Sequence, residues 1–206
     1  VREFLSASRA VMFEGNGYSA EWQEESVKRG LRSVTNATEA FHAFEEKPAV
    51  ELFTRSGILS ESEIKARVEV MEETFVKKLQ IEARVIGDIC QNHVIPAAIA
   101  YQNILLDNIR GCREVFSGQA AEICRAATAT CSEIASLVNS LSDGIATLVE
   151  VRKHANRADS ITEKARLYST DVLRSMEAVR QCADRLEMLV DDALWPLPKY
   201  RELLSL

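Results

Sequence analysis

Apolar side chains recur every three or four positions along most of this chain, which is the spacing of residues on one face of an α-helix. The clearest run begins behind Ser60 and Glu63, which have the spacing of a capping box at a helix start. Its apolar positions are Ile64, Val68, Met71, Phe75, Leu79, Ile86 and Ile89, and His93 continues the stripe. Pro96 then removes a backbone donor, so we expect a kink or break there, with helix resuming as far as Gly111.

The same pattern predicts two further long helices. After a break at 117–118, an apolar stripe runs over 119–154, with Ile123, Ala127, Ile134, Leu137, Leu141, Ile145 and Leu148 as members. A polar connection over 156–159 precedes a second capping box at 160–163. The helix behind it carries Leu167, Leu173, Met176, Val179, Leu186, Leu189 and Val190. It must end before Pro196, because the residue ahead of a proline avoids helical ψ.

The first sixty residues predict shorter elements. Gly and Asn residues at 14–18 indicate a turn, and short helices are expected over 19–30, 37–46 and 48–54. Their caps and stops are Ser19, Gly30, Thr35 or Asn36, Pro48 and Gly57. Short links between long helices favour antiparallel neighbours. The sequence therefore predicts an all-α fold: an elongated antiparallel bundle of three long helices, short N-terminal helices, and a tail with Pro and Trp over 195–204 that docks on this chain or on a partner.

The composition is consistent with a fold that has few turns, and it excludes some classes of binding partner. The 206 residues include only 8 Gly and 4 Pro. A net charge of −6 and the absence of a Lys/Arg run exclude a nucleic-acid surface. No stretch approaches 18 uncharged apolar residues, so no membrane partner is expected. The start, without Met or an apolar leader, indicates a fragment. Five widely spaced cysteines without a CxxC are typical of reduced thiols in a cytoplasmic protein.

The His, Asp and Glu residues that could act as metal ligands or catalytic groups do not form a complete known motif in the sequence. Glu39 and His42 form one ExxH, whereas a carboxylate-bridged metal protein needs a second ExxH and two more inward Glu residues. His93, on the apolar stripe, is interpreted as a core or interface histidine. The carboxylate pairs at 72–73 and 191–192 point to different sides of a helix and are interpreted as solvated. No Gly-rich phosphate loop occurs. We therefore assign no catalytic, cofactor-binding or metal residue, with the metal protein kept as an alternative.

Three segments resemble one enzyme family, the type III glutamine synthetases. Residues 10–22, with Phe13-Glu14-Gly15-Asn16-Gly17-Tyr18 at their centre, resemble the end of the catalytic region of that family. Residues 81–103, including Asn92-His93-Val94-Ile95-Pro96, resemble its long central helix. Residues 194–204, with Trp195-Pro196-Leu197-Pro198-Lys199-Tyr200, resemble its C-terminus. The resemblance covers essentially the whole chain, and the three segments occur in the same order.

The resemblance implies a parent enzyme that makes glutamine from glutamate and ammonia with ATP and Mg²⁺, and that forms ring-type homo-oligomers. It places the catalytic carboxylates, the glycine-rich ATP motif and the glutamate-binding arginines upstream of this segment. Lys47-Pro48 lacks the glycines and the His of that motif, so no catalytic role is carried over. The expected organisation is 1–18 as the end of the catalytic region and 19–206 as a C-terminal helical bundle, which supports the catalytic region and contacts other subunits. The alternative is an independent helical interaction or scaffold module.

Overall fold

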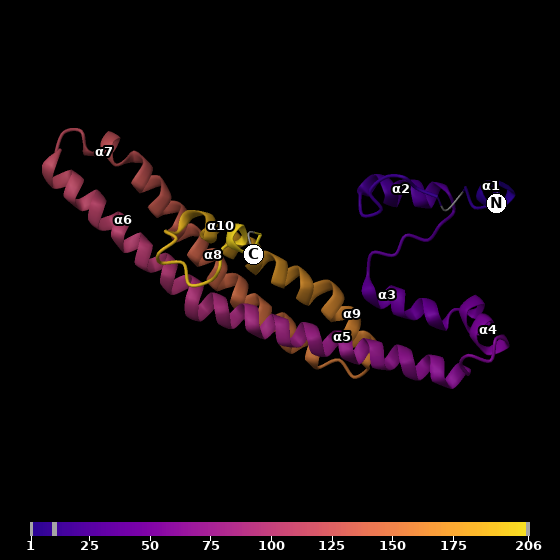
Figure 1. Ribbon diagram of the computed structural model, residues 1–206. Coiled ribbons are helices and arrows are strands. Elements are labelled where there is room, and N and C mark those ends of the chain that lie inside the picture. The colour runs from indigo at the N-terminus through magenta and orange to yellow at the C-terminus, as the bar shows by residue number, and fades with distance from the viewer. Residues whose placement is uncertain (1, 10–11, 205–206) are drawn as a thin grey trace. The chain divides into compact units, whose positions relative to one another are not determined.

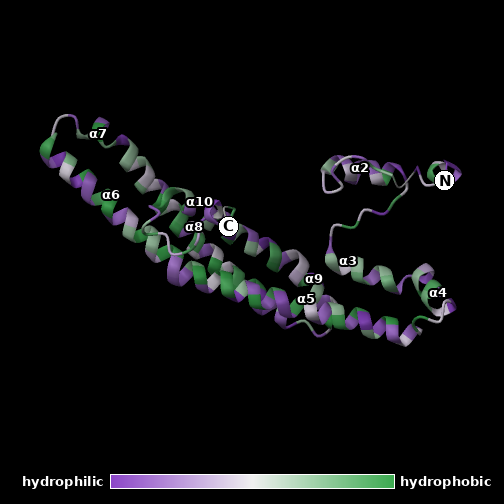
Figure 2. Cartoon of the chain, in the orientation of Figure 1, coloured by the Kyte–Doolittle hydropathy of each residue, from purple (hydrophilic) through white to green (hydrophobic). Residues whose placement is uncertain are grey.

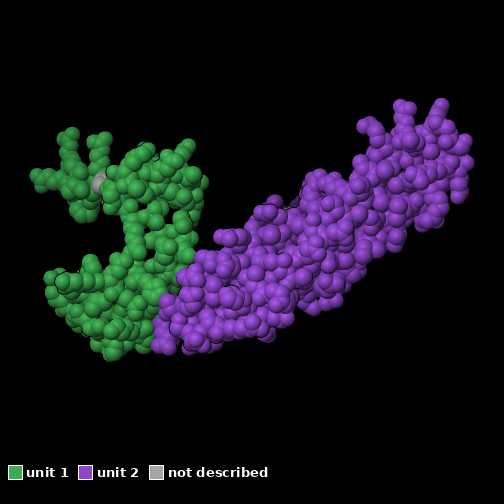
Figure 3. All heavy atoms as spheres, turned by 180° about the vertical axis from the view of Figure 1, so that it is seen from behind, with its two compact units in different colours: residues 1–68 green, residues 69–206 purple. Residues whose placement is uncertain are grey.

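A computed structural model describes residues 2–9 and 12–204 of the chain (Figure 1). All regular secondary structure in these ranges is helical, which confirms the all-α prediction. The chain divides into two compact units, residues 1–68 and residues 69–206 (Figure 3). The boundary predicted at residue 18 is a different kind of division, between two regions of a parent enzyme, and it stays a prediction.

The first unit contains short helices, and two of them begin at a side chain that caps the helix. They are α1 (Arg2–Ala7), α2 (Ala20–Lys28), α3 (Ala37–His42) with the 3₁₀ turn η2 (Ala43–Glu45), and α4 (Lys47–Arg55). The Ser19 hydroxyl accepts a hydrogen bond from the Trp22 N–H at 3.2 Å. Asn36 rather than Thr35 caps α3, because its Oδ1 accepts from the Thr38 N–H at 2.9 Å. Among the described helices of the first unit, α1 was not predicted from the sequence pattern.

The first predicted capping box is confirmed in full, and the second shows one of its two hydrogen bonds. At the start of α5 (Glu61–Ile89), the Ser60 N–H donates to the Glu63 carboxylate at 2.8 Å, and the Glu63 N–H donates back to Ser60 Oγ at 3.3 Å. At the start of α9 (Ile161–Leu167), Ser160 Oγ accepts from the Glu163 N–H at 3.1 Å. These bonds satisfy backbone donors that the start of a helix leaves without a partner.

The second unit is an elongated bundle of three long helical rods (Figure 1). The first rod is α5, the π-helical segment η3 (Cys90–Val94) and α6 (Ile95–Val115). The second is the short α7 (Ala120–Ile123) and α8 (Arg125–Asn156). The third is α9, the π-helical segment η4 (Tyr168–Val172) and α10 (Leu173–Leu189), followed by the tail and α11 (Tyr200–Leu203). The second rod packs antiparallel against the other two, as the short links predicted.

Pro96 does not break the first rod. The helix widens just before it: in η3 the Ile95 N–H donates to the Cys90 carbonyl, five residues back. A π-turn of this kind accommodates a missing donor without leaving the helical path. Beyond it, α6 continues past Gly111 to Val115. The break at Pro96, one of the two expected outcomes, does not occur, and the stop predicted near Gly111 was wrong, because the helical path is continuous as far as Val115. The other expected outcome, a kink at Pro96, stays a prediction.

The core of the second unit follows the predicted stripes but includes small residues that they left out. Leu79, Ile134, Leu141, Leu148 and Leu186 are buried. So are Ala83, Cys90, Val94, Ala98 and Ala165. From Val94 onward the buried face passes through Ala98 and Ile109. Ile99 and Leu106 are therefore exposed, as are His93 and Ile123. His93 lies exposed on the outer side of the π-turn, so its interpretation as a core histidine was wrong, and its interpretation as an interface histidine stays a prediction. Figure 2 shows apolar and polar residues alternating along the rods.

A buried polar network joins the rods at the end near the α8–α9 link. The Tyr168 hydroxyl, on a fully buried ring, donates to Asn156 Oδ1 at 2.9 Å, and Gln80 Nε2 donates to the same oxygen at 3.2 Å. Burial raises the pKa of Tyr168 above its usual value. Nearby, the buried Glu72 carboxylate accepts from the Thr162 hydroxyl at 2.9 Å. The prediction that Glu72 is solvated was therefore wrong, because its side chain turns inward and bridges α5 to α9.

One helix of the described part, α8, is long and apolar enough by composition to cross a membrane. The core helix of a bundle has the same composition, and the apolar side chains of Ile134, Leu141 and Leu148 are buried against neighbouring helices. The α8 stripe therefore has a structural use within the bundle. The absence of a membrane partner stays a prediction.

Candidate functional site: the docked C-terminal segment

The C-terminal segment, residues 195–204, lies against the helices of the second unit, to which it belongs. Trp195 is only 8% exposed and packs with the main hydrophobic core. Leu197 is partly exposed, and Leu203 and Leu204 are exposed. The predicted docking is therefore confirmed for the first part of the segment, and the apolar side chains near its end lie in solvent.

Lys199 fixes the segment to the end of α10. Its ammonium donates to the backbone carbonyls of Glu187 at 2.7 Å and Val190 at 3.0 Å. Asp192 Oδ1 lies 2.6 Å from the same nitrogen, which also lies 6.0 Å from the centre of the Trp195 ring. The last carbonyls of a helix have no partner within the helix and carry its negative dipole end. Lys199 thus supplies a cation and hydrogen-bond donors where α10 needs both.

Asp191 and Asp192 are exposed just beyond the end of α10, as their interpretation as a solvated helix end predicted, and they also take part in this junction. Asp192 pairs with Arg201 as well as with Lys199. The Asp191 carboxylate accepts from the Ala193 N–H at 2.7 Å and so shapes the turn out of α10. Both carboxylates therefore have structural partners in the tail, which the sequence pattern did not indicate.

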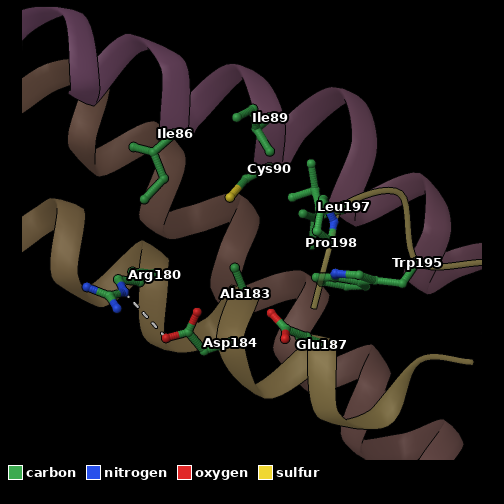
Figure 4. Close-up of a pocket in the computed structure, with 11 residues that line it drawn as sticks. Ile86, Ile89, Cys90, Arg180, Ala183, Asp184, Glu187, Trp195, Leu197 and Pro198 are labelled. Atoms are coloured by element: carbon green, nitrogen blue, oxygen red, sulfur yellow. Dashed lines mark ion pairs between the residues drawn. The ribbon is translucent and has the colours of Figure 1, made fainter. Parts of the chain in front are cut away.

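A pocket of about 280 Å³ lies between this segment, the first rod and α10 (Figure 4). Trp195, Leu197 and Pro198 form one wall, and the opposite walls include Ile86, Ile89, Cys90, Val94 and Ala183. Arg180 and Asp184, 3.5 Å apart, lie at the polar side together with Glu187. Burial raises the pKa of the Cys90 thiol to about 11, with a smaller contribution from Cys182, so the thiol stays protonated near neutral pH. The pocket can hold an apolar group, but it lacks a reactive nucleophile.

A second built feature lies in the first unit, at the predicted turn. The Asn16 side chain accepts from the Tyr18 N–H at 3.0 Å, which confirms the turn. The rings of Phe13 and Trp22 lie 4.4 Å apart, and the Arg29 guanidinium lies 5.9 Å from the Trp22 ring centre. Arg29 also donates to the Met12 carbonyl. The Gly15 backbone lies so close to the Phe13 ring that a Cβ there would come within 2.6 Å of it.

The candidate metal residues are not brought together. His42 Nδ1 lies 2.8 Å from the Glu45 carboxylate rather than in a group with Glu39. His93 and His154 are exposed on helices of the second unit. Within 2–9 and 12–204, no group of three or more His, Cys, Asp or Glu residues could hold a metal ion. The described residues therefore give the carboxylate-bridged metal alternative no support.

Comparison of the chain with known proteins identifies its family. Residues 1–113 match the family described as the glutamine synthetase C-terminal domain. The chain belongs to this family. The match includes the Phe13–Trp22 turn and the first rod through Cys112, two of the three segments that carried the resemblance.

Relatives extend the similarity over the rest of the chain. A glutamine synthetase of Bacteroides fragilis is 38% identical over 205 residues, which is 99% of this chain and 28% of that protein. A type-3 glutamine synthetase of Dictyostelium discoideum is 30% identical over 207 residues, 100% of this chain and 28% of that protein. A glutamine synthetase of Butyrivibrio fibrisolvens is 28% identical over 204 residues, 99% of this chain and 29% of that protein. The chain thus spans less than a third of the length of these relatives.

Proposed function

We propose that this chain is the C-terminal structural part of a glutamine synthetase that ligates ammonia to glutamate at the expense of ATP. The observation that carries the proposal is the 38% identity to a glutamine synthetase over 99% of the chain, together with the family match. The two compact units supply buried packing and capped helices, and among the residues that the structure describes no group of three or more His, Cys, Asp or Glu could hold a metal ion. The role of the chain is therefore to support the catalytic region and to contact other subunits.

We propose that the ATP and Mg²⁺ of such an enzyme bind outside this chain. In support, no group of three or more His, Cys, Asp or Glu residues in the described ranges could hold a metal ion. The Lys47-Pro48 dipeptide opens α4 instead of a glycine-rich loop. We place both ligands in the region upstream of this chain, with the cytoplasm as the compartment, which agrees with five free cysteines.

The outer face of α5 is the surface that we assign to subunit contacts. Ile81 is 62% exposed and Val85 is 48% exposed, and they are one helical turn apart in the second unit. Neighbouring exposed aliphatic side chains of this kind mark interaction surfaces more often than isolated ones. The proposed partner is the upstream region or another subunit of a ring-type homo-oligomer.

The first test is the source gene. If the proposal holds, the reading frame upstream of Val1 encodes the glutamine synthetase catalytic motifs. An upstream frame without them, or a gene product that ends at this chain and stays monomeric, would favour the independent interaction module instead.

The second test uses the full-length protein. Ile81→Asp with Val85→Asp should reduce the assembly mass in analytical ultracentrifugation and lower ATP-dependent glutamine formation. The control, Thr74→Asp with Lys78→Gln, changes the net charge equally at exposed polar positions of the same helix and should leave both unchanged. An intact assembly in the first variant would refute the assignment of this face.

A further inference from the structure

Three of the five cysteines gather at the far end of the second unit, away from the tail. Cys112 lies near the end of α6, Cys124 lies between α7 and α8, and Cys131 lies in the second turn of α8. They form a small cluster with Ile109, separate from the main core. The chain between the first two makes a tight reversal, in which the Gln119 N–H donates to the Phe116 carbonyl at 2.8 Å. This reversal brings the two thiols to opposite sides of one junction.

Cys112 and Cys124 pack in the same small cluster and differ in exposure. Cys124 is 3% exposed, whereas Cys112 is partly exposed at the surface of the cluster. The neighbouring Cys112 thiol and, secondly, burial raise the pKa of Cys124, so its S–H stays protonated. An accessible sulfur next to a sheltered thiol is the arrangement of redox cysteines that have a resolving partner.

We propose that Cys112 and Cys124 are a peroxide-responsive modification site that forms a reversible disulfide. The Cys112 thiolate attacks one oxygen of hydrogen peroxide, the O–O bond breaks, and hydroxide leaves a Cys112 sulfenic acid. The Cys124 sulfur then attacks the sulfenic sulfur and forms the S–S bond, while the hydroxyl leaves with the Cys124 proton as water. The two thiols are oxidised and the peroxide is reduced to two waters. A cellular dithiol reverses the reaction by thiol–disulfide exchange.

The other three cysteines serve as controls within the same molecule. Cys90 is 2% exposed and its pKa is raised by burial, and burial also raises the pKa of Cys182. Cys90 lies in the main core, where peroxide reaches it poorly, and Cys182, which is partly exposed, packs against that core and not in the small cluster. Cys131, 8% exposed, is the rival partner because it shares the cluster. The proposal is therefore specific: Cys112 pairs with Cys124, and Cys131 remains a thiol.

Peptide mapping of the full-length protein tests this pairing directly. Native protein is treated with a small excess of hydrogen peroxide, alkylated with N-ethylmaleimide, unfolded and digested with trypsin. Arginines place Cys112 in peptide 111–113, Cys124 in 114–125 and Cys131 in 126–152. The expected product is peptide 111–113 joined to 114–125, lighter than the sum of both by two hydrogens and released by dithiothreitol. A joined peptide that contains 126–152 instead, or no joined peptide at all, would overturn the proposal.

Variants separate the pairing from general oxidation. Cys112→Ser and Cys124→Ser should each abolish the joined peptide, whereas Cys131→Ser and Cys182→Ser should retain it. Circular dichroism establishes that each variant keeps its helices. A second measurement is independent of oxidation: phenylarsine oxide, which chelates two adjacent thiols, should bind the native wild type one to one. Cys112→Ser should weaken that binding at least tenfold, and equal binding by wild type and variant would contradict the proximity of the two thiols.

Discussion

Replacement of Lys199 by Met measures how strongly the tail is held. The Lys199 side chain is 11% exposed, and its ammonium donates to two backbone carbonyls and pairs with Asp192. Met keeps the length and the apolar stem but removes the cation and its donors. Hydrogen bonds from a charged group contribute about 1.5–3 kcal/mol each, and carbonyls that regain water recover part of this. We therefore expect the variant to lose about 2–4 kcal/mol of tail-docking free energy.

Trp195 reports the loss, because its ring is buried while the tail is docked. In a Trp22→Phe background, Lys199→Met should shift the tryptophan emission to longer wavelength at lower urea concentration than the parent. Hydrogen exchange in the last turn of α10 should rise with it. Lys153→Met is the matched control: Lys153 is exposed and pairs with Glu150 at 2.8 Å on one helix face, so a change of less than about 0.5 kcal/mol is expected. Unchanged emission and exchange in Lys199→Met would refute the role given to this residue.

Two further predictions concern buried groups of the second unit. Tyr168→Phe removes the hydroxyl that donates to Asn156 and should lower the free energy of unfolding in urea by about 1–2 kcal/mol, and a loss near zero would show that water replaces the bond. Folding favours the protonated Cys90 thiol, whose pKa rises from 9.0 to about 11, so its contribution is complete below pH 9 and is lost as the pH rises toward 11. Stability should fall by about 1–3 kcal/mol across that window, and a Cys90→Ala variant with an equally steep fall would contradict this assignment.

Helix positions were predictable from sequence because their signals are local. Ser60, Ser160 and Ser19 lie within three residues of the groups that they cap, so residue order alone indicates the bonds. Large apolar residues such as Leu141 and Leu148 were identified as core by spacing. Small residues such as Ala83 and Ala98 were missed, because alanine occurs on buried and on exposed helix faces alike. Their burial depends on how closely neighbouring rods approach, which spacing does not encode.

The tail junction was predictable only in outline. Trp195 and its prolines indicated docking, but the partners of Lys199 are the end of α10 and Asp192, which the sequence pattern interpreted as a solvated helix end. Glu72 shows the same limitation, because the Thr162 hydroxyl that it accepts from is 90 residues away in the chain. Contacts of this kind depend on how the rods pack, whereas caps and stripes depend on neighbours in sequence.

The two widened turns, at 90–94 and 168–172, have a consequence for comparing family members. Each places one more residue in a helical turn than an ordinary helix would, so every side chain beyond it is rotated by about 100° relative to its position in an uninterrupted α-helix of the same sequence. A homologue that lost a single residue within either segment would close the wide turn to an ordinary one and present the equivalent side chains to the bundle along the remainder of that rod. Residue-by-residue correspondence with such a homologue would then hold on one side of the segment and be offset by one position on the other.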